Sequence, residues 1–228
     1  IAVPAYEQSS DQEVAFQAVD YILRVLKKNM VFGMTWGRAM HEFVEQLAKD
    51  ERLRSLSFQN VKVVPFLGTP GAIQSDSWNT TTYSNTLATK VGNLLHCASY
   101  NLSAPMYVEG TKEKELIESI DEIAKVLHMA ETADIALIGI GSMQDDSSII
   151  KAEIRTREEY KELVRKGAVG EIVGRIYDKN GQTVDEDLKR KMVGISLDKI
   201  AKIPVRVGMS YGKDKIEAIK GAIAGGLV

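Results

Sequence analysis

Apolar residues along the chain follow two spacings, one typical of helices and one typical of buried strands. Residues 11–28 place apolar side chains every three or four positions and predict a helix, and the short apolar run 29–32 that follows predicts a strand. The same helical spacing predicts further helices over 39–47, 83–100, 113–129, 157–166 and 212–224. β-branched or continuous apolar runs predict strands over 61–67, 133–141, 171–177 and 204–209, with an extended piece over 104–108.

This alternation of strands and helices predicts the fold class. Connections that each carry a helix favour parallel pairing, because the helix crosses the face of the sheet between two strands. We therefore predict an α/β fold with three layers, in which helices cover both faces of a Rossmann-like parallel sheet. A small β-hairpin insertion is expected around 173–193, since Asp178-Lys179-Asn180-Gly181 has the composition of a hairpin turn. We expect residues 1–228 to form one domain.

Three glycine-rich segments, each predicted to form a turn, lie among these elements: GMTWGR at 33–38, GIGS at 139–142 and GAVG at 167–170. The first joins a predicted strand to a predicted helix. The first amides of a helix have no partner inside the helix, and such amides bind anions. The glycine spacing matches neither GxGxxG nor GxxxxGK[ST], which argues against a nucleotide-binding motif. A role in merely tightening the turn stays open as the alternative.

The turns after Phe32, Leu67, Ile140 and Met209 follow predicted strands. In a parallel sheet all of these turns lie at the carboxyl edge, where ligands of open α/β sheets bind. We therefore expect them to converge on one site.

Composition restricts the function classes. A net charge of −2 over 228 residues provides no basic surface of the kind that binds nucleic acid. No apolar run approaches the roughly 20 residues needed to cross a bilayer. The single cysteine, Cys97, cannot form an internal disulfide, and no signal-peptide pattern opens the chain. We therefore expect a cytoplasmic protein.

The sequence lacks the motifs of hydrolytic and metal enzymes. It contains neither GxSxG nor HExxH, and each of His41, His96 and His128 falls inside a predicted helix. Histidines in such positions more often have structural or surface roles than bind metal. We expect no catalytic residue, no metal and no cofactor.

Several segments, in this order along the chain, resemble the effector domain of SorC/DeoR-type bacterial transcriptional regulators. The resemblance extends over nearly the whole chain. It is carried by Trp36-Gly37-Arg38, Val64-Pro65 with Gly68, Ser84-Asn85, and the segments 133–141, 167–171, 178–181, 195–197, 203–204 and 212–219.

This resemblance implies a fold similar to ribose-5-phosphate isomerase and glucosamine-6-phosphate deaminase, used for sensing. It implies that a phosphorylated sugar is the effector, and that the chain forms a homodimer or homotetramer. It also implies that operator DNA is bound only by an N-terminal helix-turn-helix domain, which is missing from this chain.

Site residues are carried over from the resemblance position by position. The phosphate would be bound by Gly33, Thr35, Trp36, Gly37, Arg38 and Lys215, and the sugar by Gly68, Asn85, Gly139, Gly141 and Glu171. Ala39 stands where the family turn commonly has a threonine, which removes one hydroxyl donor. Asn85 is also expected to cap its helix.

An enzyme on the same fold is the alternative function. A sugar-phosphate isomerase or aminosugar-phosphate deaminase needs a positioned acid and base. The sequence supplies Glu171 and Asp178 for this purpose, without an obvious histidine or lysine companion. The sensing function is therefore favoured.

Overall fold

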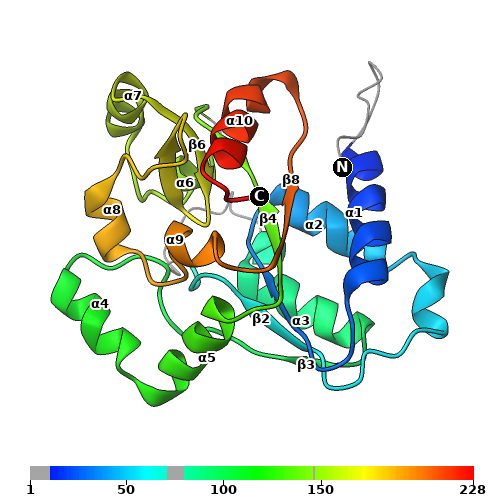
Figure 1. Cartoon of the computed structure of the whole chain (residues 1–228). Coiled ribbons are helices and arrows are strands. Elements are labelled where there is room, and N and C mark those ends of the chain that lie inside the picture. Colours follow the sequence, from blue (N-terminus) through cyan, green and yellow to red (C-terminus); the bar gives the residue numbers. More distant parts are fainter. Residues whose placement is uncertain (1–10, 71–79, 146) are drawn as a thin grey trace.

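The computed structural model describes residues 11–70, 80–145 and 147–228. Within these residues, five parallel strands form one sheet in the order β3-β2-β1-β4-β8 (Figure 1). These strands are β1 (Val31–Met34), β2 (Lys62–Pro65), β3 (Ala98–Ser99), β4 (Ile135–Gly139) and β8 (Val205–Met209). Parallel pairing throughout the sheet confirms the predicted α/β class.

Alternate residues of the central strands point to opposite faces of this sheet, as the pleat requires. Phe32 of β1 and Ile135 of β4 face one layer of helices and are fully buried there. This layer consists of α1 (Asp11–Val25), α2 (Arg38–Leu47) and α3 (Ser84–Leu94) (Figure 1). Burial of apolar side chains is the main driving force that holds these helices to the sheet.

Val64 of β2 and Ile138 of β4 face the opposite side, where they join a second buried core. The helices on this side are α5 (Asp121–Glu131) and α9 (Leu197–Ile200), with α4 (Thr111–Glu118) packed on α5. Helices thus cover both faces, and the three-layer prediction is confirmed.

A smaller antiparallel sheet follows β4 in the chain. Its strands are β5 (Gly141–Ser142), β6 (Ala168–Ile172) and β7 (Arg175–Asp178), paired in that order. The segments around it are α6 (Ser148–Lys151), α7 (Arg157–Arg165), α8 (Glu186–Lys191) and α10 (Ile216–Ala224). Short 3-10 segments are η1 (Glu51–Arg54), η2 (Thr80–Thr82) and η3 (Lys213–Lys215). The predicted small antiparallel unit therefore exists, but its hairpin is β6–β7, which begins before residue 173 and turns back at Val173-Gly174.

The prediction of one strand over 171–177 is wrong, because the chain turns back in the middle of that segment. Val173 and Gly174 connect β6 to β7, with φ angles of 54° and 69°. Valine rarely adopts a positive φ, so Val173 is not a residue type that indicates a turn, and Gly174 alone did not outweigh the strand pattern around it. The prediction that 167–170 is a turn is also wrong for most of its length, since β6 begins at Ala168.

Two predicted helices are shorter than expected. The predicted helix over 113–129 is divided at Ile120, which has extended backbone and precedes α5. The helix predicted over 83–100 ends at Leu94 and is followed by His96 at a φ of 51°. The predicted turn at 178–181 is confirmed, because the amide of Gly181 donates to the carbonyl of Asp178 over 2.9 Å.

Arg175 fixes the small sheet to α8 and to the segment that follows this helix. Its guanidinium is buried and donates to the carbonyls of Lys189, Met192 and Gly194 over 3.0–3.2 Å. Burial lowers the pKa of Arg175 to about 10, although the charge of Glu118 acts to raise it. The guanidinium remains charged at neutral pH and serves as the donor for this segment.

Gly33, expected to bind phosphate, has a packing role in the middle of β1. A Cβ at this position would lie 1.9 Å from the ring of Phe66, which is fully buried. We expect Gly33→Ala to lower the free energy of unfolding by about 1–3 kcal/mol, because the ring must shift inside a close-packed core. Urea unfolding followed by circular dichroism measures this loss.

The double variant Gly33→Ala/Phe66→Leu provides the control for that prediction. A smaller side chain at position 66 makes room for the new methyl group, so the two changes should cost less together than the sum of their separate losses. If the loss in the double variant equals the sum of the two separate losses, the ring of Phe66 is not the reason that position 33 requires glycine.

Candidate functional site

The connections from β1 lead to β2 on one side, whereas β4 and β8 extend the sheet on the other side. This arrangement creates a topological switch point between the carboxyl ends of β1 and β4. Thr35 joins the two ends: its amide donates to the carbonyl of Leu137 over 3.1 Å, and its hydroxyl accepts from the amide of Gly139 over 2.9 Å. Open α/β sheets bind their ligands at such a point, so the first and second glycine-rich segments lie at the expected place.

The first turn contributes fewer free amides than the sequence suggested. Gly37 precedes α2 with a φ of 103°, and its amide donates to the carbonyl of Thr82 over 3.0 Å. The amides of both Thr35 and Gly37 are therefore used within the protein, which corrects the expectation that they face a phosphate. Because glycine brings no capping side chain, the amino end of α2 at Arg38 is the part of this turn suited to an anion.

Glu171 lies beside this turn, opposite Gly141 in the pairing of β5 with β6. A Cβ at position 141 would lie 2.7 Å from Oε2 of Glu171, so the glycine allows the carboxyl group to approach closely. The amide of Gly174 and the indole of Trp36 both donate to this carboxyl group. Both residues are buried: Glu171 is 6% exposed and Trp36 is 5% exposed.

Burial raises the pKa of Glu171, and the two hydrogen bonds and the positive charge of Lys215 offset only part of that rise. Such a group changes its protonation state nearer to neutral pH than an exposed glutamate does. The ionised carboxylate can accept a hydrogen bond from a hydroxyl group of a ligand, and the protonated carboxyl group can donate a hydrogen bond to one.

Lys215 reaches the same place from the start of α10. Its ammonium donates to the hydroxyl of Ser142 over 2.8 Å, and that hydroxyl donates to Asp214 over 2.8 Å. Trp36, Glu171 and Lys215 come from distant parts of the sequence and are brought together at the switch point. Ser142 and Asp214 were not predicted as site residues, although Ser142 ends the second glycine-rich segment.

Tyr177 fixes helix α10, which begins directly after Lys215. Its fully buried hydroxyl donates to the carbonyl of Ala218 in α10 over 2.9 Å. A Cβ at Gly170 would lie 2.5 Å from this hydroxyl, so the glycine makes room for the ring. The strands β6 and β7 and helix α10 are thereby packed closely, which sets the position of Lys215 relative to Glu171.

Gly68 and Asn85 belong to a separate cluster after β2. The amide group of Asn85 donates to Thr69 over 2.8 Å and to the carbonyl of Leu102 over 3.1 Å, and its oxygen accepts from the amide of Leu102. Asn85 does not cap α3, which begins after Tyr83 without a side-chain cap, so that expectation is wrong. A Cβ at Gly68 would lie 2.5 Å from the carbonyl oxygen of Ala104.

These contacts give Gly68 and Asn85 structural roles, and their binding to a sugar stays a prediction. Most of the segment 69–82 between them, namely residues 71–79, lies outside the described residues.

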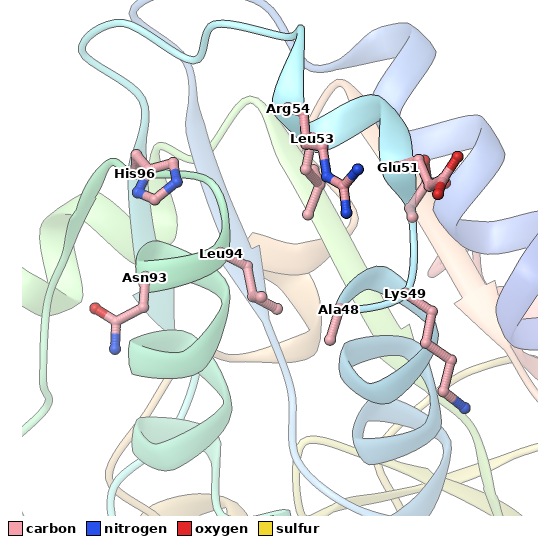
Figure 2. A pocket seen from close by; sticks show the side chains of 9 residues that line it. Ala48, Lys49, Glu51, Leu53, Arg54, Asn93, Leu94 and His96 are labelled. Carbon is pink, nitrogen blue, oxygen red and sulfur yellow. The ribbon is translucent and has the colours of Figure 1, made fainter.

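A cavity of about 470 Å³ lies at the opposite edge of the sheet (Figure 2). It is formed where α2 and α3 end, and Figure 2 shows charged side chains of both signs around it. Its lining residues are Ala48, Lys49, Asp50, Glu51, Leu53, Arg54, Asn93, Leu94 and His96. It shares no residue with the cluster at the switch point, which we take as the candidate site.

Metal chemistry finds no support in the residues that the structure describes. No group of three or more histidine, cysteine, aspartate or glutamate side chains is placed there to hold an ion. Helices long and apolar enough to span a membrane are likewise not found among those residues.

The sequence model of a family described as "Putative sugar-binding domain" matches residues 1–228. The chain belongs to this family. The sugar-binding domain is 26% identical over 215 residues to the transcriptional regulator LsrR of Enterobacter sp. (strain 638), which covers 92% of this chain and 61% of LsrR. It is 28% identical over 204 residues to the sorbitol operon regulator of Klebsiella pneumoniae, which covers 89% of this chain and 61% of that regulator. The chain thus spans about three fifths of the length of these relatives.

Solved structures share the fold of the sugar-binding domain. The full-length sorbitol operon regulator SorC of Klebsiella pneumoniae superposes with a TM-score of 0.86 at 24% identity, over 100% of this chain and 71% of SorC. A DeoR family transcriptional regulator from Listeria monocytogenes superposes with a TM-score of 0.82 at 23% identity, over 100% of this chain and 85% of that one. The predicted resemblance to SorC/DeoR-type regulators is confirmed.

The raised pKa of Glu171 predicts a pH dependence of stability. A carboxyl group whose pKa is higher in the folded state contributes stability below its unfolded pKa of about 4.3 and loses that contribution as the pH rises through the folded value. Glu171→Gln cannot titrate. We therefore expect the difference in unfolding free energy, variant minus wild type, to increase as the pH rises from 4 to 8.

Urea unfolding of both proteins at a series of pH values measures this difference. The other titratable groups are the same in the two proteins, so their contributions cancel in it. Parallel stability profiles would show that Glu171 titrates alike in the folded and unfolded chains.

Proposed function

We propose that this sugar-binding domain binds a phosphorylated sugar at the switch point between β1 and β4. The observation that carries the proposal is the convergence of three side chains from distant parts of the sequence: Lys215 donates to Ser142, next to Gly141 that pairs with Glu171, and the indole of Trp36, two residues before α2, donates to Glu171. A cation and a helix amino end suit a phosphate, and a carboxyl group suits sugar hydroxyls. The family to which the chain belongs supports the sugar, and the phosphate is our inference from these groups.

In the proposed complex, the ammonium of Lys215 and the first turn of α2 bind the phosphate. The carboxyl group of Glu171 binds sugar hydroxyls, and Trp36 holds this carboxyl group in place through its indole. Gly139 and Gly141 allow the groups of the site to lie close together, because a side chain at position 139 would press on the turn at Thr35 and Trp36, and one at position 141 would press on the carboxyl group of Glu171.

The proposed biological role is the sensing of this sugar by a cytoplasmic transcriptional regulator. Binding would favour one arrangement of the domain in a homodimer or homotetramer, and would thereby change the affinity of a DNA-binding domain for its operator. This proposal rests on the relatives, which are named as transcriptional regulators. Nothing in those names supports the isomerase or deaminase alternative, and we do not retain it.

Thermal unfolding with a panel of sugar phosphates tests the proposal. A ligand at 100 times its dissociation constant adds about 2.7 kcal/mol to the stability of the folded state, which raises the Tm by roughly 5–10 °C for a chain of this size. The same sugars without phosphate serve as controls and should produce much smaller shifts. Equal Tm shifts with and without the phosphate group would show that the domain does not recognise that group. The absence of any Tm shift would show that sugar phosphates are not its ligands.

A further inference from the structure

The ammonium of Lys215 already has an anionic neighbour. Oδ2 of Asp214 lies 3.5 Å from Nζ of Lys215, and the hydroxyl of Ser142 connects the two groups through hydrogen bonds of 2.8 Å on each side. The site that is proposed to take a phosphate therefore contains a carboxylate next to its principal cation.

The backbone before α10 leaves room for this carboxylate beside Lys215. Gly212 has a φ of 103°, and a Cβ at this position would lie 2.5 Å from Oδ1 of Asp214. Only glycine adopts such a conformation without strain and leaves room for the carboxylate. Burial acts to raise the pKa of Asp214, but the hydrogen bond from Ser142 and the charge of Lys215 outweigh it and lower the pKa, so the group is ionised at neutral pH.

The side chain of Asp214 is also more exposed than that of Lys215, at 46% against 18%. The carboxylate can therefore move into solvent without breaking the core, whereas the ammonium stays where it is. This difference is what an exchangeable counter-ion requires.

We propose that Asp214 is an internal counter-ion that competes with the phosphate of the ligand for Lys215 and so sets the affinity and specificity of the site. The proposal rests on the proposed function. An anion that enters must displace the carboxylate from the ammonium and from the hydroxyl of Ser142, because two anions cannot share these donors without repulsion. A neutral sugar does not have to displace it.

Isothermal titration with inorganic phosphate, ribose 5-phosphate, glucosamine 6-phosphate and neutral ribose tests this role. Asp214→Asn keeps the shape of the side chain and removes its charge. We expect the variant to bind the three phosphate compounds about three- to tenfold more tightly, with a smaller gain at high salt, and to bind ribose as the wild type does. Glu217→Gln is the matched control, since Glu217 is 68% exposed in the first turn of α10 and should leave all affinities unchanged.

A double-mutant cycle with Lys215→Ala separates competition for the lysine from a general change of charge. If Asp214 acts through Lys215, its substitution brings no gain once the lysine is absent. A gain in affinity that persists without Lys215 would contradict the role of Asp214 as a counter-ion. The same holds if Asp214→Asn binds the phosphate compounds as tightly as the wild type does, or more weakly. Failure of the proposed function looks different: wild type and Lys215→Ala would then bind these compounds equally, or not at all.

Discussion

Replacing Arg175 by methionine is expected to lower the free energy of unfolding by about 3–5 kcal/mol, among the largest losses a single change in this domain can produce. The guanidinium donates to the carbonyls of Lys189, Met192 and Gly194, all in one segment after β7. Methionine fills a similar volume but leaves these buried acceptors without their donor. For a domain with a total stability of roughly 5–15 kcal/mol, this change lowers the Tm by about 10 °C.

Urea and thermal unfolding of the variant measure the loss. The control is Arg165→Met, because Arg165 is 72% exposed and pairs with Glu162 on the same helix. The free energy of unfolding of Arg165→Met should fall by no more than about 0.5 kcal/mol. Similar small losses at both positions would mean that the carbonyls near Arg175 find other donors, and that this arginine does not fix the small sheet.

The parallel sheet could be predicted from the sequence because its strands are defined by local patterns. The continuous apolar run over 133–141 contains β4, which is buried on both faces, and β2 lies within a β-branched run. The places where prediction failed lack such local signals. Val173 adopts a backbone conformation that its side chain disfavours, and Ile120 continues the helical spacing across a break between two helices.

The candidate site could be predicted in part. Glu171 and Lys215 followed from the resemblance to a family, and a site at the carboxyl edge of the sheet followed from the predicted parallel strands. The position of the switch point between β1 and β4 required the strand order of the structure. What the sequence could not show is which hydrogen-bonding groups are already used within the protein. The hydroxyl of Thr35, for example, accepts from the amide of Gly139, which is a contact between two distant turns. Ser142 was missed for the same reason, since its importance comes from Lys215 and Asp214 rather than from its neighbours in the sequence.

Lys215→Ala is expected to weaken the binding of a sugar phosphate by about ten- to a hundredfold, since one charge-assisted contact contributes roughly 1.5–3 kcal/mol. The substitution removes the ammonium, which is the charged donor proposed to bind the phosphate. Folding should be nearly unaffected, because the side chain lies in a polar network at the edge of the sheet and not in the core. Isothermal titration with the sugar phosphate that produces the largest thermal shift measures the change in affinity.

Lys213 provides the matched control for this prediction. It lies in the same 3-10 segment as Lys215 and is exposed, and its replacement by alanine removes the same charge within two residues. If the ammonium of Lys215 binds the phosphate, Lys213→Ala should change the affinity by less than about threefold, which is the range expected for a screened charge nearby. Equal losses in the two variants would mean that the segment attracts the anion only through its overall charge, and the phosphate would then have to be bound at the amino end of α2 alone.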